Sequence, residues 1–107
     1  MDVEYTGRQT RVTKKLKLQT EAGLERIAKI VGKSGSVHVT LSTDKHRQIA
    51  EITVQTRRQK LVARCEATEM ETALHDALQK VEQHAIRHKK RYDTMRDHPK
   101  PIAAEAA

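Results

Sequence analysis

The side chains with the clearest chemical signature in this chain are cationic. The 107 residues include 21 Lys and Arg against 14 Asp and Glu, a formal net charge of +7. Residues 1–34 and 84–100 together hold fourteen of the cations against six acids, whereas residues 35–83 are balanced. The run from Arg87 to Arg91 reads RHKKR and contains no acid. A fold that brings the two ends together would form a basic face, which suits a polyanion, and nucleic acid is the usual one.

The other reactive side chains lack the partners that catalysis or metal binding requires. Cys65 is the single cysteine and follows the apolar run LVAR, which is typical of a small buried side chain. His84 and His88 are four residues apart, as two ligands on one helix would be, but no Cys or carboxylate is spaced to complete a site. No P-loop, paired carboxylates or nucleophile motif occurs. We therefore predict no enzyme, no metal, no cofactor and no small-molecule substrate.

The apolar periodicity predicts the first elements that position these charges. Val3 and Tyr5 alternate with acids, which favours a short first strand. Apolar or small residues then recur at helical spacing, with Thr13 as the expected N-cap and Gly32 or Gly35 as the stop. That helix carries the stripe Val12, Leu16, Thr20, Leu24, Ile27 and Val31.

The second half of the chain predicts three strands and another helix. The segments SVHVTLS, IAEITVQT and KLVARCEA alternate or are rich in β-branched residues, and their short connections favour an antiparallel meander. Thr68 and Glu71 match a capping box that would start the last helix. Its apolar stripe is Met70, Leu74, Ala77, Val81 and Ala85.

The predicted order β-α-β-β-β-α gives an α+β fold. We expect a four-stranded sheet with both helices packed on one face, similar to a double-stranded-RNA-binding domain. Only two aromatic residues are present, so the core must be aliphatic. We expect one domain over residues 1–92 and a flexible tail over residues 93–107, where HPKPIAAEAA has little to bury. Because so few residues follow the last helix, we expect a monomer off its partner.

The charges are sorted by helix face. At 100° per residue, the first helix presents one line of cations while Glu21 and Glu25 lie on another flank. The second helix presents another cationic line, about a quarter turn from its apolar stripe. These lines consist of Lys15, Arg26, Lys29 and Lys33, and of Lys80, His84, Arg87 and Arg91. The competing interpretation is a solvated surface, because a helix C-terminus favours cations by about 0.3–1 kcal/mol each.

Three stretches in this order resemble a known family. YTGRQTRVT, VHVTLS and EMETALHDALQKVEQHAIRHKK together are similar to the ribosome hibernation-promoting factors, also called ribosome-associated inhibitors or sigma-54 modulation proteins. The resemblance covers about residues 3–92 and is to the short form of the family. It implies binding to the small ribosomal subunit near the decoding centre, and inhibition of translation in stress or stationary phase. One departure is Glu69-Met70-Glu71, where the family commonly has Asp-Met-Tyr.

The resemblance and the cationic lines of the two helices together give a candidate set of RNA-binding residues. The family's Gly-Arg after the first strand matches Gly7-Arg8, and its basic helix positions match Lys17, Arg26 and Lys29. With both cationic lines, the predicted set is Arg8, Lys15, Lys17, Arg26, Lys29, Lys33, Lys80, Arg87, Lys89, Lys90 and Arg91. The partner would be ribosomal RNA, bound through phosphates and shape, so scarce aromatic residues are no obstacle.

Two other functions compete with ribosome binding. A protein-interaction or transcription modulator of the sigma-54 type would act without ribosomal RNA, and would need an exposed apolar patch. A small enzyme would have to be built around Cys65 or the histidines. No apolar run is long enough to span a membrane and no leader is visible, so we expect a cytoplasmic protein without membrane contact.

Overall fold

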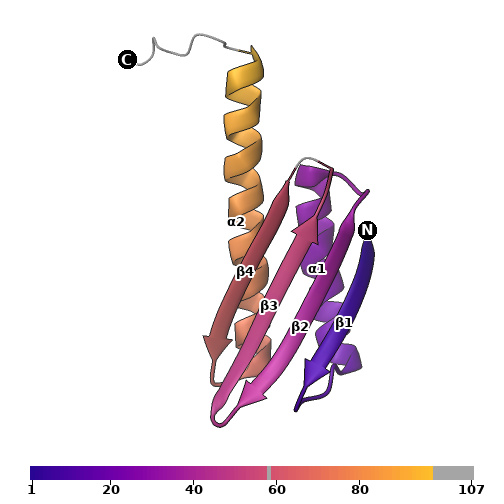
Figure 1. Ribbon diagram of the computed structural model, residues 1–107, viewed down its shortest axis with the longest axis vertical. Helices are drawn as coiled ribbons and strands as arrows, with labels where there is room; N and C mark the ends of the chain where they lie inside the picture. Colours follow the sequence, from indigo (N-terminus) through magenta and orange to yellow (C-terminus); the bar gives the residue numbers. More distant parts are fainter. Residues whose placement is uncertain (58, 98–107) are drawn as a thin grey trace.

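The computed structural model describes the backbone of residues 1–57 and 59–97 and, within these, the side chains up to His88. Its elements follow the order predicted from the sequence (Figure 1). They are β1 (Asp2–Arg8), α1 (Lys14–Val31), β2 (Ser36–Asp44), β3 (Arg47–Gln55), β4 (Lys60–Ala67) and α2 (Met70–Asp97). None of the helices in these residues combines the length and apolar character needed to cross a membrane.

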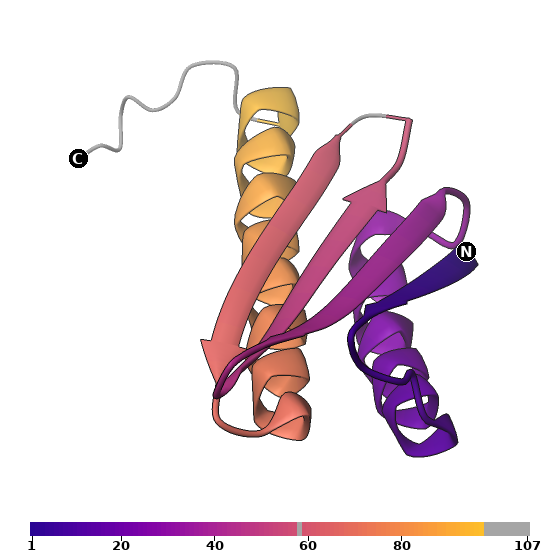
Figure 2. The same ribbon diagram turned by 60° about the horizontal axis from the view of Figure 1, so that its bottom comes forward.

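The four strands form one sheet in the order β1-β2-β3-β4. β1 pairs in parallel with β2, because α1 carries the chain back to the start of the sheet, and the other two pairs are antiparallel. Both helices cover the same face (Figures 1 and 2). Since α1 follows β1 and α2 follows β4, and these strands point the same way, the two helices run roughly parallel. The predicted α+β architecture is confirmed.

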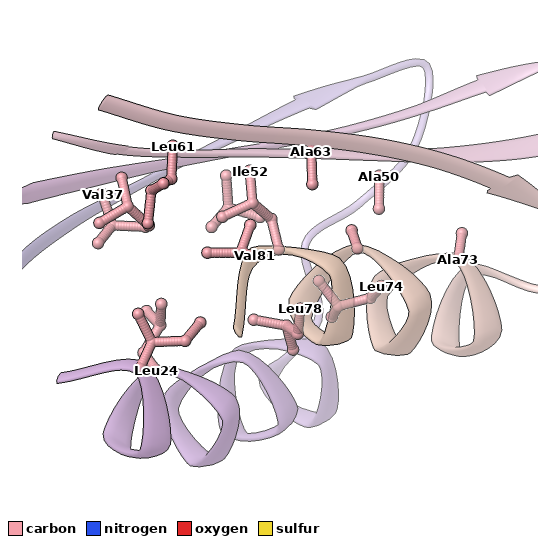
Figure 3. Close-up of a cluster of buried hydrophobic side chains, with 14 of the residues drawn as sticks. Leu24, Val37, Ala50, Ile52, Leu61, Ala63, Ala73, Leu74, Leu78 and Val81 are labelled. Atoms are coloured by element: carbon pink, nitrogen blue, oxygen red, sulfur yellow. The ribbon is translucent and has the colours of Figure 1, made fainter. Parts of the chain in front are cut away.

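The core lies between the sheet and the helices and is aliphatic, as the composition requires. Alternate strand residues such as Val39, Leu41 and Ile52 are fully buried. Several of the side chains between α2 and the strands are small, such as Ala73 on the helix, Ala50 on β3 and Ala63 on β4 (Figure 3). Small residues on both sides let α2 lie close to β3 and β4. The helices, and the cations on them, are therefore held on a rigid platform.

A glycine sets the distance between the two helices. A Cβ atom at Gly23 of α1 would lie 2.8 Å from Cδ1 of Leu78 on α2, well inside ordinary contact distance. Leu78 is itself buried and packs in the core. The glycine inside the helical pattern, which lowers intrinsic helix stability, is thus explained by the close approach of α2.

The helix ends agree with the sequence predictions in part. Thr13 caps α1, its hydroxyl accepting a hydrogen bond from the Leu16 amide at 3.2 Å, and Gly32 ends the helix with φ +97°. The predicted cap of α2 is wrong by one residue, because the Ala73 amide donates to the carbonyl of Glu69 and not of Thr68. α2 continues to Asp97, so part of the expected tail is helical. Residues 98–107 lie outside the described residues.

Candidate nucleic-acid interface

Two of the predicted cations of α1 face α2 and contact its carboxylates. Lys15 Nζ lies 2.8 Å from a Glu71 oxygen, and Arg26 Nε lies 4.0 Å from a Glu82 oxygen. Lys15 and Arg26 are eleven positions apart, as are Glu71 and Glu82, so the two pairs repeat after about three turns of two parallel helices. These four residues line the surface between α1 and α2, here called the α1/α2 groove. Each cation in it has a neighbouring carboxylate that offsets its charge.

These pairs are exposed and stabilise the fold little. The side chains of Lys15 and Arg26 are 77% and 65% exposed, and solvent screens such pairs strongly. The hydrogen bond that Lys15 donates to Glu71, together with the negative charge of that carboxylate, raises the pKa of Lys15. The pairs matter more for the potential of the groove, because each carboxylate offsets a cation that the sequence analysis had counted as available.

Lys17 lies on a different flank of α1 from Lys15. Its Nζ is 5.5 Å from the ring centroid of Tyr5 on β1, within cation–π range. Burial raises the pKa of the Tyr5 phenol, and the negative charge of Glu21 adds to the effect. Arg8 is exposed at the end of β1. Lys17 and Arg8 thus border β1, separate from the groove between the helices.

Lys29 and Lys33 form the uncompensated part of the first cationic line. Lys29 lies in the last turn of α1 and Lys33 directly follows the capping Gly32. Both side chains are exposed, and neither pairs with an acid among residues 1–57 and 59–88. At a helix C-terminus they also meet the negative end of the dipole. They remain available for an external anion.

The cationic line of α2 lies on the flank turned away from α1. Lys80 lines a shallow groove with Asp76 and with Arg64 and Glu66 of β4. Arg87 follows two turns later on the same flank and is exposed. Lys89, Lys90 and Arg91 lie in the helical backbone, and their side chains are outside the described residues. We expected both cationic lines on one basic face. Glu71 and Glu82 of α2 instead lie between them.

One cationic segment was missed by the sequence analysis. The residues between the segments IAEITVQT and KLVARCEA were treated only as a short connection, and Lys60 only as the start of a strand, although TRRQK is a visible basic run. Arg57 and Lys60 are both exposed. Figure 1 shows the β3–β4 connection at the same end of the sheet as the C-terminal end of α1 and beside α2. Its basic composition was the signal that could have indicated it.

The structure offers little support for a metal centre or a reactive thiol. No group of three His, Cys, Asp or Glu is placed to hold a metal ion among the described residues. Cys65 is half-buried and lines the β4–α2 groove beside Lys80, a groove whose lining contains no histidine. His38 on the open face of the sheet contacts Glu4 and Thr6 at 3.4 and 3.0 Å. These are polar contacts across β1 and β2.

Comparison with protein families and solved structures gives a consistent result. The family model described as Sigma 54 modulation protein / S30EA ribosomal protein matches residues 3–93. No curated protein matches the chain. A ribosomal subunit interface protein from Coxiella burnetii superposes with a TM-score of 0.77 at 21% identity, covering 84% of this chain and 99% of that one. The N-terminal domain of Thermus thermophilus Protein Y gives 0.73 at 22% identity, covering 82% and 99%. At these identities the two structures show a shared fold.

Proposed function

Because the chain belongs to the Sigma 54 modulation protein / S30EA ribosomal protein family, we propose that it is a ribosome-associated hibernation factor. It binds the small ribosomal subunit near the decoding centre and inhibits translation in stress or stationary phase. The observation that carries this proposal is the exposure of cations at the C-terminal end of α1 and in the second half of α2, represented by Lys29, Lys33 and Arg87, which pair with no acid among the side chains that the structure describes. A protein bound to ribosomes works in the cytoplasm.

Phosphate recognition explains how so few aromatic residues suffice. Lys and Arg side chains on a rigid surface bind a folded RNA through its backbone and shape, with no base stacking. The ring of Tyr5 is partly buried and lies beneath Lys17, so it is not a stacking platform. The family relationship points to a ribosome-associated factor, and we propose no catalytic step.

The predicted RNA contacts fall into groups that differ in how much of their positive charge is offset by a neighbouring acid. Lys29, Lys33 and Arg87 are direct contacts in this proposal, and Lys15 and Arg26 contribute less because Glu71 and Glu82 partly offset them. The proposal keeps the remaining members of the predicted set as contacts at the edges of the surface. These are Arg8, Lys17, Lys80, Lys89, Lys90 and Arg91.

The test is cosedimentation with purified small ribosomal subunits over a series of salt concentrations. The variant Lys29→Glu/Lys33→Glu removes two exposed cations and should weaken binding about tenfold or more. The salt dependence should flatten by about 1.5 units of the log–log slope, because each lost phosphate contact removes roughly 0.7–0.9 unit. Since both side chains are exposed, the free energy of unfolding should fall mainly through the lost interaction with the helix dipole, by about 1 kcal/mol or less per site.

The matched control reverses the charge of two cationic residues at the opposite end of the sheet. Lys45 lies in the β2–β3 turn and Arg47 is the first residue of β3. Both side chains are exposed, so Lys45→Glu/Arg47→Glu changes the net charge equally, at the cost of the exposed contact between Arg47 and Glu66. It should leave binding within about twofold of the wild type. Equal weakening by both variants would mean that only net charge matters. No weakening by either would contradict the proposal and favour a function that does not use ribosomal RNA.

A further inference from the structure

The connection between β3 and β4 is a second cationic element that the proposed contacts do not include. It holds Arg57 and leads into Lys60, the first residue of β4, and both side chains are exposed. In the view of Figure 1 it lies at the upper end of the sheet, where α1 ends and α2 passes. Its position raises the question of whether its charge belongs to the same surface as that of α1.

Hydrogen bonds between Thr56 and Gln59 join the two ends of this connection. The Thr56 amide donates to the Gln59 carbonyl at 2.9 Å, closing the connection. The Thr56 hydroxyl also donates to that carbonyl and accepts from the Gln59 amide, each at 3.2 Å. Arg57 therefore starts from a backbone that is already ordered, and binding through it loses less conformational entropy than binding through a loose loop.

The turn packs directly against the connection that carries Lys33. A Cβ atom at Gly35 would lie 2.6 Å from the Gln55 carbonyl oxygen and 3.3 Å from Cγ2 of Thr56. Only a glycine allows this approach, and the φ of +127° at Gly35 favours glycine as well. Lys33 lies two residues before this contact and Arg57 one residue beyond it. The end of α1 and the β3–β4 turn therefore form one continuous end of the molecule.

The cations at this end differ from those at the opposite end in their partners. At the opposite end, Arg47 and Arg64 both contact Glu66, at 3.4 and 3.3 Å. Neither Arg57 nor Lys60 pairs with an acid among the residues whose side chains the structure describes. Like charges gathered from separate segments repel and do not help folding. An external polyanion would relieve that repulsion.

We propose that Arg57 and Lys60 form a third contact for RNA phosphates, continuous with Lys29 and Lys33 at the end of α1. The inference rests on the proposed function and adds to it an element of the sheet. The RNA surface is then a cationic end of the molecule built from the end of α1 and from Arg57 and Lys60 of the β3–β4 connection, in addition to the outer flank of α2.

The experiment measures binding of Arg57→Glu/Lys60→Glu to purified small ribosomal subunits in the same salt series. We expect the affinity to fall about tenfold or more and the slope to flatten by about 1.5 units, as for Lys29→Glu/Lys33→Glu. The control is again Lys45→Glu/Arg47→Glu, in the other hairpin turn. A thermal melt checks that each variant is folded. If the reversal impairs folding, the neutral pair Arg57→Gln/Lys60→Gln replaces it, with a weaker effect in the same direction.

The outcomes separate this inference from the proposed function. If the α1 variant weakens binding and the turn variant behaves like the control, the turn is not a contact and the proposed function stands. If neither variant differs from the control, both proposals fall. If both variants weaken binding and flatten the salt dependence, the turn is part of the RNA surface. Weaker binding with an unchanged slope would show that the turn only supports the fold, and would overturn the inference.

Discussion

Because Gly23 packs against Leu78, the effect of Gly23→Ala on the free energy of unfolding should change sign when the Leu78 side chain is removed. In the wild type, a methyl group at position 23 would lie 2.8 Å from Cδ1, 3.0 Å from Cδ2 and 3.2 Å from Cγ of Leu78. Ordinary carbon contacts are about 3.5–4.0 Å. Leu78 is only 6% exposed, so it must move within a packed core to admit the methyl group.

Two opposing terms set the magnitude for Gly23→Ala. Replacing a glycine inside a helix by alanine gains about 1 kcal/mol of intrinsic stability. Overpacking a core costs about 1–3 kcal/mol. We therefore expect Gly23→Ala to lower the free energy of unfolding by about 1 kcal/mol. In a Leu78→Ala background, which itself costs about 2–5 kcal/mol, the obstacle is gone and the same change should stabilise the protein by about 1 kcal/mol.

The assay is urea unfolding followed by circular dichroism for the wild type, both single variants and the double variant. The coupling energy should be about 2 kcal/mol, within the range for residues in direct contact. Ala22→Gly, at an exposed position of the same helix, measures the propensity term alone and should cost up to about 1 kcal/mol. A stabilising effect of Gly23→Ala in the wild-type background would refute the close approach of the two helices.

The partly buried phenol of Tyr5, the acids of the α1/α2 groove and the exposed apolar side chains each lead to a prediction. The raised pKa of Tyr5 means that the folded state favours the neutral phenol, so this contribution to stability is complete below about pH 10 and is lost as pH rises through the folded pKa. Tyr5→Phe should therefore lose less stability than the wild type in urea unfolding between about pH 9 and 11.5, and an identical pH dependence would contradict this. Neutralising the groove with Glu71→Gln/Glu82→Gln should tighten binding to small ribosomal subunits about twofold or more in the salt series, because it releases two cations. Unchanged affinity would show that the groove does not face RNA. Light scattering at micromolar concentration should show a monomer, because among the described side chains the large apolar ones that are exposed, Leu18, Val62 and Ile86, lie on three separate elements. A stable dimer would refute this.

The fold could be predicted from the sequence because each element carries a complete local signal. The alternation of Val37, Val39 and Leu41 identifies β2, and Thr13 and Gly32 bracket α1. Glu69 shows where local signals fail. Thr68 has the better capping chemistry, yet the helix begins one residue later, where the chain leaving β4 meets the core.

The arrangement of the charges could not be predicted in the same way. A helical wheel gives the angle between residues on one helix, but not the rotation of that helix against its neighbour. The wheel placed Lys15 with Lys29, whereas the parallel alignment of the helices brings Lys15 against Glu71. The contribution of the β3–β4 turn depends on Gly35, since only the tertiary packing of that glycine brings the turn to the end of α1.

The acids in the α1/α2 groove restrict how RNA can lie on this surface. Glu71 and Glu82 offset the cations beside them, so the groove has no excess positive charge, while the end of α1 and the outer flank of α2 keep theirs. At the effective dielectric of a protein surface, a carboxylate 4 Å away repels a phosphate by about 4 kcal/mol and cancels the attraction of an equally distant cation. A backbone laid along the groove is thus disfavoured. In the proposed complex the two cationic areas would contact different stretches of backbone, an arrangement that a folded ribosomal RNA provides more readily than one straight duplex.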